Sequence, residues 1–349
     1  MTGSQAVLTT VLGDIPASDM GITLPHEHLF NDLSGVVDEP YYGFSQRLVG
    51  AKVDPSLMWA LRQDPYCCAD NMAPKPVADV VTEVAAFAEV GGRTIVDATG
   101  TSAIGRAPER LVEVAKQTGI NVVMSTGTYL EKFEGERITA RTVDAQVADI
   151  VSELTVGVGE TGIRAGMIGE IGVSPSFTPA EREALRAAGI AQTERPNVAL
   201  NIHLPGWERF GHDVLDVVLN QAGVAPHKVS LAHSDPSGAD VEYQHGLLDR
   251  GVWLEFDMVG LDITFPKEGV SPTPDETATA IANLVAAGYQ DQIVLSHDLF
   301  LKQMWSQNGG NGFAYVPRVF LEILKSKGVS EQVCHQLITS NPQRLLTSR

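Results

Sequence analysis

The sequence predicts an α/β protein folded as a single (β/α)8 TIM barrel, with polar residues at the C-terminal ends of the strands. Two observations predict the barrel: eight short, continuously apolar runs, and amphipathic stretches with helical spacing in the gaps between them. Continuous apolar character is typical of parallel strands buried on both faces. Eight strands that alternate with helices over most of a 349-residue chain match one barrel of this type.

The eight predicted strands are short, and most of them end in a polar or charged residue. A doubly wound sheet is the alternative fold, but no glycine-rich phosphate loop follows any early strand, so the barrel is favoured. In chain order the runs are 22–26, 94–97, 121–124, 165–170, 198–203, 229–233, 252–257 and 293–298.

Helices between these runs are indicated by their ends as well as by their apolar spacing. Pro108 is placed to begin a helix that Gly119 ends, since proline suits the first turn and glycine the position past the last. The segments 178–181 and 273–276 both read Thr-Pro-x-Glu and predict capping boxes. Further amphipathic stripes lie at 80–88, 143–154 and 313–324.

We expect residues 1–349 to form one (β/α)8 barrel domain with one large insertion. The insertion covers about 31–76, directly after the first strand, and it is rich in Pro, Tyr and Asp. A second, shorter loop at 258–273 follows the seventh strand.

Composition narrows the classes of partner. The formal net charge is −18, and such an acidic surface disfavours nucleic acids and anionic membranes. No apolar run approaches the roughly 18 residues of a membrane span. Three cysteines, Cys67, Cys68 and Cys334, form no disulfide framework, and no signal peptide precedes the first strand. We therefore expect a cytoplasmic protein that acts on a small molecule.

Polar side chains close the predicted strands, and this pattern points to chemistry. His26 and His28 are two residues apart on a strand, so both side chains point to the same face. Strand ends in a barrel converge on the face where active sites lie. A buried polar group without a partner costs about 1–3 kcal/mol, so these side chains must share partners or a metal. The set is His26, His28, Asp97, Glu170, His203, His233, Asp257 and Asp298.

The histidines and carboxylates of this set suit two divalent transition-metal ions. Neutral imidazoles combined with carboxylates favour Zn, Mn, Co or Fe over Ca or Mg, and zinc is the first expectation. The six expected ligands are His26, His28, Glu170, His203, His233 and Asp298.

With these residues in view, the sequence resembles the phosphotriesterase family of the amidohydrolase superfamily, and within it the branch of phosphotriesterase-related proteins. The resemblance covers nearly the whole chain. Its motifs are 21–28 (GITLPHEH), 92–97 (GRTIVD), 169–172 (GEIG), 233–235 (HSD), 296–298 (SHD), 309–313 (GGNGF) and 341–346 (NPQRLL).

The resemblance implies a role for each ligand. His26, His28 and Asp298 would hold the more buried metal ion, and His203 and His233 the more exposed one. Many members bridge the ions with a carbamylated lysine. This chain has Glu170 at that position, as in the glutamate-bridged branch, and glutamate needs no modification. A metal-bridging hydroxide would be the nucleophile, with Asp298 as the catalytic residue that takes the proton.

The resemblance also implies the class of substrate. It favours a metal-dependent hydrolase that cleaves a carbon-centred acyl bond, in a lactone, carboxylic ester or amide. Phosphotriester hydrolysis is the alternative, but organophosphate-hydrolysing members have a proton-relaying histidine where this chain has Met258. A non-catalytic metal-binding barrel is the alternative from another class, and the complete ligand set argues against it. Relatives of this kind are commonly homodimers. A homodimer is therefore one expected assembly, although the sequence leaves the oligomeric state open.

Several residues near the strand ends are weaker candidates. The loop residues Tyr129, Trp207, Met258 and Phe300 are expected to line a substrate pocket, although plain loop packing would explain each of them equally well. Asp97 and Asp235 are expected either to orient a metal ligand or to satisfy backbone donors. His297 alternates with Asp298, so it is expected to face away and to pack within the core.

Overall fold

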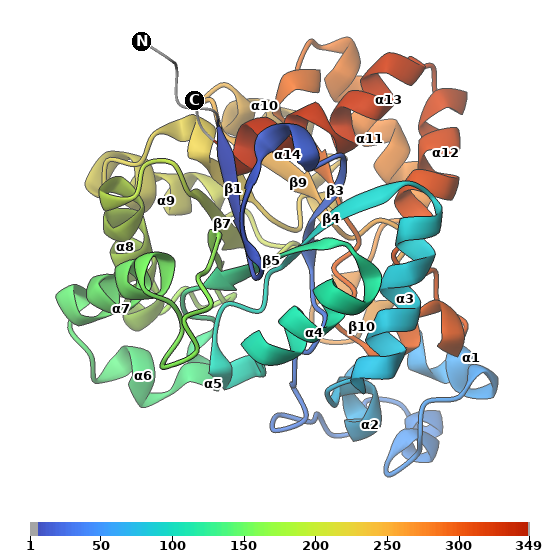
Figure 1. Cartoon of the computed structure of the whole chain (residues 1–349). Coiled ribbons are helices and arrows are strands. Elements are labelled where there is room, and N and C mark those ends of the chain that lie inside the picture. Colours follow the sequence, from blue (N-terminus) through green and yellow to red (C-terminus); the bar gives the residue numbers. More distant parts are fainter. Residues whose placement is uncertain (1–5, 348–349) are drawn as a thin grey trace.

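The computed structural model describes residues 6–347, and its centre is a nearly closed barrel of eight parallel strands with helices around it (Figure 1). The predicted fold is confirmed, and all eight apolar runs form strands. Each strand pairs with the next along the chain, which is the topology of a (β/α)8 barrel. The strands are β3 (Ile22–Glu27), β4 (Gly92–Asp97), β5 (Asn121–Thr126), β6 (Met167–Gly172), β7 (Ala199–His203), β8 (Val229–Leu231), β9 (Trp253–Phe256) and β12 (Ile293–Leu295).

The predicted helix starts and ends are confirmed at Gly119 and at the two capping boxes. Both capping boxes are present: the hydroxyls of Thr178 and Thr273 accept from backbone N–H groups, and Glu181 and Glu276 return the contact. Gly119 ends its helix with a φ of 71°, which glycine adopts without strain. The longer helices are α3 (Val77–Glu89), α4 (Pro108–Thr118), α7 (Val143–Thr155), α8 (Pro179–Glu194), α10 (Val241–Leu248), α11 (Pro274–Ala286), α13 (Glu331–Ile338) and α14 (Ser340–Leu346). The shorter ones are α1 (Met58–Leu61), α2 (Ala69–Met72), α5 (Glu131–Glu134), α6 (Glu136–Thr139), α9 (Gly211–Leu215) and α12 (Leu321–Ser326).

The seam between β3 and β12 is closed mainly by side chains. The fully buried Glu27 carboxylate accepts hydrogen bonds from Ser296 Oγ (2.8 Å), from His297 Nδ1 (2.7 Å) and from the Leu299 backbone N–H (3.0 Å). His297 therefore packs away from the barrel centre, as its alternation with Asp298 predicted. A buried carboxylate with several donors fixes the start of the loop after β12.

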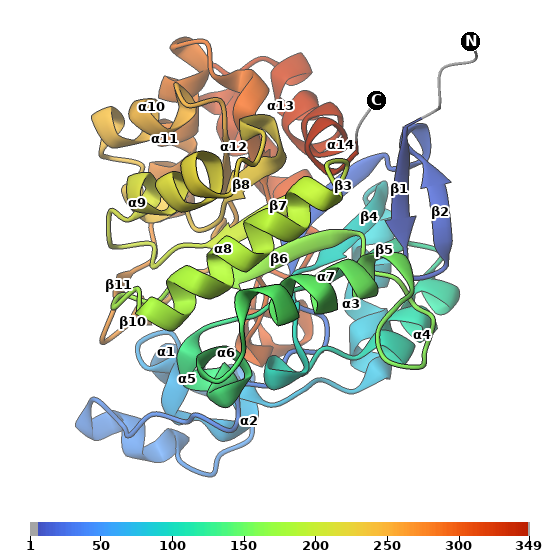
Figure 2. The same ribbon diagram turned by 90° about the vertical axis from the view of Figure 1, so that its left-hand side faces the viewer.

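Two hairpins were not predicted, and they lie at opposite ends of the barrel (Figures 1 and 2). At one end, β1 (Val7–Thr10) pairs with β2 (Gly13–Pro16), and Leu8 packs against residues such as Val96 in the apolar cluster there. At the other end, β10 (Thr264–Phe265) pairs with β11 (Gly269–Val270) within the loop after β9. Both hairpins are too short to produce a strand pattern that the sequence would reveal.

The insertion after β3 is fastened to the loop after β12, at the same end as β10 and β11 (Figures 1 and 2). Asn71 of α2 donates to Gln303 Oε1 (2.8 Å) and accepts from the Gln303 N–H (2.9 Å). Lys302 pairs with Asp70 at 3.0 Å. The insertion thus holds the segment that begins with Asp298.

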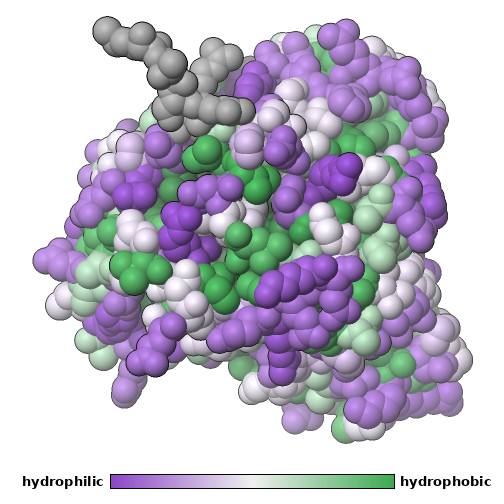
Figure 3. Space-filling view, viewed as in Figure 1, coloured by the Kyte–Doolittle hydropathy of each residue, from purple (hydrophilic) through white to green (hydrophobic). Residues whose placement is uncertain are grey.

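Hydrophilic residues cover most of the molecular face in Figure 3, with apolar residues showing between them. Within residues 6–347 no helix has the length and apolar character that crossing a bilayer would require.

We expect the Asn71→Ala variant to lower the free energy of unfolding by about 1–3 kcal/mol, because it removes both side-chain bonds to Gln303 and leaves buried groups unpaired. Asn220→Ala is the matched control, since Asn220 is exposed and its side chain bonds only to Asp216 within the described residues; its effect should stay within about 0.5 kcal/mol. Urea unfolding followed by fluorescence measures both. Equal effects for the two variants would contradict the role given to the insertion.

Candidate metal centre

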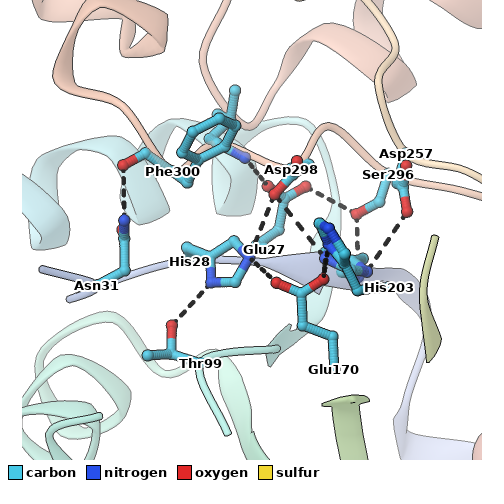
Figure 4. A network of polar contacts seen from close by, with 12 residues as sticks. Glu27, His28, Asn31, Thr99, Glu170, His203, Asp257, Ser296, Asp298 and Phe300 are labelled. Carbon is cyan, nitrogen blue, oxygen red and sulfur yellow. Dashed lines mark hydrogen bonds and ion pairs between the residues drawn. The ribbon is translucent and has the colours of Figure 1, made fainter. Parts of the chain in front are cut away.

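All six predicted ligands come together at the C-terminal end of the barrel (Figure 4 shows His28, Glu170, His203 and Asp298 among them). His26 and His28 lie at the end of β3, Glu170 lies in β6 and His203 ends β7. His233 and Asp298 were expected within strands, but β8 ends at Leu231 and β12 ends at Leu295, so both residues lie in the loops that follow. His233 and Asp298 have φ values of 57° and 53°, and such left-handed residues cannot continue a strand.

The Glu170 carboxylate lies between histidines on two sides. Its Oε1 is 3.2 Å from His28 Nε2, whereas its Oε2 is 3.0 Å from His203 Nδ1 and 3.4 Å from His233 Nε2. His26 Nε2 is 3.6 Å from Oε2. Oε1 thus faces His28, and Oε2 faces the other three histidines. A carboxylate placed between histidines in this way can bridge two cations.

Asp298 completes the side nearer to β3. Its Oδ1 is 3.2 Å from His28 Nε2 and 3.8 Å from His26 Nε2. Ligand atoms of His26, His28 and Asp298 all lie within 4.8 Å of one another, and so do those of His26, Glu170 and His233. These two overlapping groups have the donors and the spacing to hold divalent ions.

His26 supplies the sharpest sign that a ligand belongs here. It is fully buried, yet within the described residues neither of its ring nitrogens has a hydrogen-bond partner. Buried polar atoms in native proteins are nearly always paired, and an imidazole nitrogen without a partner among buried carboxylates and histidines suits metal ligation. The residues present therefore fit a metal centre.

Burial and neighbouring charge act against each other on the ligands. Burial lowers the pKa of His26, but the carboxylates of Asp257 and Glu170 outweigh it and raise that pKa to about 10. Burial likewise lowers the pKa of His28, and Asp298 and Glu170 raise it to about 9. The raised pKa values mean that protons compete with a cation for both rings at neutral pH.

Asp257 was predicted as one of the polar strand-end residues that share partners or a metal, but no specific role was assigned to it. Its Oδ1 is 3.0 Å from His233 Nδ1, and its Oδ2 is 3.4 Å from His26 Nδ1. One carboxylate thus bonds to His233 and lies close to His26, so it contacts a histidine from each side of the centre. Glu255, two residues earlier on the same face, lies 3.6 Å from His26 Nδ1. Period-two alternation along β9 is the signal that could have placed both in the site.

Asp97 and Asp235 have no direct contact with the six ligands among the contacts of residues 6–347. Asp97 accepts from the backbone N–H groups of Leu29 and Thr99, both at 2.9 Å, and Thr99 Oγ1 lies 2.8 Å from His28 Nδ1. Asp97 therefore supports the backbone of Thr99 and of Leu29, and Figure 4 shows the Thr99 hydroxyl beside the His28 ring.

Asp235 is a support for the loop after β9. It accepts from the Met258 N–H and from Thr277 Oγ1, each at 3.1 Å. Burial and the nearby Asp257 raise the pKa of its carboxyl group to about 7. Of the two roles expected for Asp235, its contacts match the satisfaction of a backbone donor rather than the orientation of a metal ligand.

A cavity of about 310 Å³ opens beside the cluster. All four predicted pocket residues, Tyr129, Trp207, Met258 and Phe300, line it. Tyr129 Oη is 3.4 Å from His203 Nδ1. The aromatic residues Tyr66, Phe133 and Phe265 also line the cavity. They were not predicted, because none of them directly follows a predicted strand.

Lys75 is a buried cation near the site that the sequence did not reveal. Its Nζ donates to Phe300 O (2.7 Å) and to Asn31 Oδ1 (2.5 Å), and the Asn31 amide donates to the same carbonyl (2.9 Å). Burial lowers the pKa of Lys75 to about 7. Lys75 and Asn31 together hold the Phe300 backbone next to Asp298.

Comparison with known proteins agrees with this geometry. A sequence profile described as the phosphotriesterase family matches residues 6–346. A phosphotriesterase-related protein of Nematostella vectensis and an N-acetyltaurine hydrolase of Danio rerio are each 30% identical, and each alignment covers 99% of both proteins. The crystal structure of a resiniferatoxin-binding protein from Rhodobacter sphaeroides is 41% identical, with a TM-score of 0.94, over 97% of this chain and 94% of that one.

Metal affinity should rise steeply with pH, because His26 and His28 carry raised pKa values and a metal binds only the neutral imidazole. The sign follows directly: below a pKa of about 9 for His28 and about 10 for His26, protons compete with the metal, and the competition fades as pH approaches those values. We expect roughly tenfold or more tighter Zn²⁺ binding per pH unit between pH 6 and 8. Calorimetry in buffers of different ionisation enthalpy measures the released protons. Zn²⁺ affinity independent of pH, with no proton release, would contradict this description of the site.

Proposed function

Since the chain belongs to the phosphotriesterase family and is a hydrolase, we propose that it cleaves a carbon-centred acyl bond, in a lactone, a carboxylic ester or an amide, with two divalent transition-metal ions. The single observation that carries the proposal is Glu170, whose two oxygens face different histidines. The 30% identical relative named N-acetyltaurine hydrolase supports an acyl bond, and an amide in particular.

In this proposal His26, His28 and Asp298 hold one ion, His203 and His233 hold the other, and Glu170 lies between them. The ions, when bound, supply a water of lowered pKa as the nucleophile and a Lewis acid for the acyl oxygen. Zinc suits the donor set, and Mn, Co or Fe would also be accepted by it. Residues 1–349 form one catalytic domain in this proposal, and the insertion supports the site.

Asp298 is the proposed catalytic residue among the ligands. One of its oxygens faces His28 Nε2 at 3.2 Å, and the other faces His233 Nδ1 at 3.9 Å. The carboxylate therefore stands between the two groups of histidines and borders the cavity where the substrate would lie. From there it can take the proton of the attacking water and give it to the departing alcohol or amine.

The cavity side chains divide between polar and apolar roles. Tyr129 places a hydroxyl beside His203, where it can donate a hydrogen bond to a substrate oxygen. Trp207, Met258 and Phe300 offer apolar contacts to the rest of the substrate. Met258 is buried and lines the cavity, so the position of the relaying histidine holds a side chain that carries no proton. This disfavours a phosphotriesterase.

A substrate panel tests the proposal. Protein loaded with Zn²⁺, Mn²⁺ or Co²⁺ should release protons from lactones, esters or N-acyl amino acids in preference to phosphotriesters. Glu170→Gln should abolish this turnover, because it removes the carboxylate charge between the two groups of histidines. Glu83→Gln is the control, since Glu83 is also buried but bonds to Ser306 and Gln307. Turnover of phosphotriesters alone would contradict the proposed bond.

Asp298→Asn should keep much of the bound metal, because the amide oxygen can still ligate, and lose most of the turnover, because an amide cannot carry the proton. General acid–base groups contribute typically 10²–10⁴-fold, so we expect kcat to fall by about that factor while metal content measured by mass spectrometry changes little. Full activity with intact metal content would remove Asp298 from proton transfer.

A further inference from the structure

Four aromatic side chains form one continuous wall of the cavity, although they come from four separate loops. Tyr66 comes from the insertion, Trp207 from the loop after β7, Phe265 from β10 and Phe300 from the loop after β12. The Phe265 and Phe300 rings are 6.4 Å apart and within 17° of parallel. Tyr66 lies 5.3 Å from Phe265, and Trp207 lies 5.8 Å from the same ring. We call these four residues the aromatic wall.

The aromatic wall begins at the metal ligands. Phe300 follows Asp298 by two residues, and its ring lies 6.5 Å from the His28 ring in an edge-to-face arrangement (Figure 4). From Phe300 the wall continues through Phe265 to Trp207. A substrate whose reacting bond lies at the ligands can therefore place one of its substituents against this wall.

Backbone contacts hold the wall in place before any substrate enters. Trp207 Nε1 donates to Val270 O at 3.2 Å, and Gly269 permits this approach because a Cβ there would come within 2.2 Å of that nitrogen. The Thr264 N–H, next to Phe265, donates to Arg62 O of the insertion at 2.7 Å. The Phe300 carbonyl is held by Lys75 and Asn31, as described above. A preformed wall loses little conformational entropy on binding.

We propose that the aromatic wall is a specificity subsite that binds an aromatic ring of the substrate, next to the acyl bond of the proposed function on which this inference rests. Aromatic rings carry a negative face and a positive edge, and their pairing adds to the effect of burial alone. A saturated ring of the same size gains the burial but not the pairing. The aryl compound should accordingly be favoured by roughly two- to tenfold over its cyclohexyl counterpart.

Binding of compounds that cannot be hydrolysed tests the subsite without turnover. 4-Phenyl-2-butanone has the shape of benzyl acetate with the ester oxygen replaced by carbon, and 4-cyclohexyl-2-butanone is its saturated counterpart. Calorimetric titration of the zinc-loaded protein should give a dissociation constant about two- to tenfold lower for the phenyl ketone. Equal affinity, tighter binding of the cyclohexyl ketone, or binding of neither ketone would overturn the proposal.

Variants connect the preference to the wall. Phe265→Leu should abolish the discrimination between the two ketones, and Trp207→Leu serves the same purpose if Phe265→Leu does not fold. Phe44→Leu is the matched control, because Phe44 stacks on Tyr42 in the insertion and does not line the cavity. It should keep the discrimination. A preference that survives loss of Phe265 and Trp207 would overturn the assignment.

Kinetics separate this inference from the proposed function. The pairs are benzyl acetate against cyclohexylmethyl acetate, and methyl phenylacetate against methyl cyclohexylacetate. A higher kcat/KM for the aryl member of either pair supports the subsite and reports on which side of the bond the ring lies. Hydrolysis without any aryl preference contradicts the subsite alone. No hydrolysis of any ester, lactone or amide, with the ketone preference intact, contradicts the proposed function and leaves the aryl subsite supported.

Discussion

The structure depends on one constraint, which is the exclusion of water from a dense group of ionisable side chains at one end of the barrel. His26, Glu255 and Asp257 are fully buried, and Glu170 is nearly so. Isolated charges at such depth would each cost several kcal/mol. Mutual pairing, altered protonation and bound cations can each offset that cost. Within the described residues, both ring nitrogens of His26 are left without a hydrogen-bond partner. The buried charges therefore support the proposed metal centre.

The rest of the fold keeps these groups in register. Glu27 closes the β3–β12 seam by accepting hydrogen bonds from Ser296, His297 and Leu299, which lie on both sides of Asp298 in the sequence. Asp257 couples a histidine on each side of the centre. The insertion reaches across to hold the loop after β12 through Asn71 and Lys75. The same loop carries Phe300, so the segment that positions Asp298 also positions part of the aromatic wall.

The sequence alone was enough to predict the barrel, the eight strands and the six residues that meet at their ends. Continuous apolar runs are a local property, and barrel geometry turns their ends into neighbours. Contacts that depend on three-dimensional assembly could not be read in this way. Asp257 was visible at a strand end, but its partners lie on β3 and beyond β8. The wall residues Tyr66 and Phe265 lie far from any predicted strand end, and nothing in the pattern around Lys75 distinguishes it from a surface lysine.

The most direct measurement is the metal content of the purified full-length protein, determined by mass spectrometry after loading with Zn²⁺ and removal of free ion. About two ions per chain for the wild type and for Glu83→Gln, with one or fewer for Glu170→Gln, is the result that a glutamate-bridged binuclear centre predicts. No bound metal in the wild type, or two ions that remain after Glu170 is replaced, would contradict it.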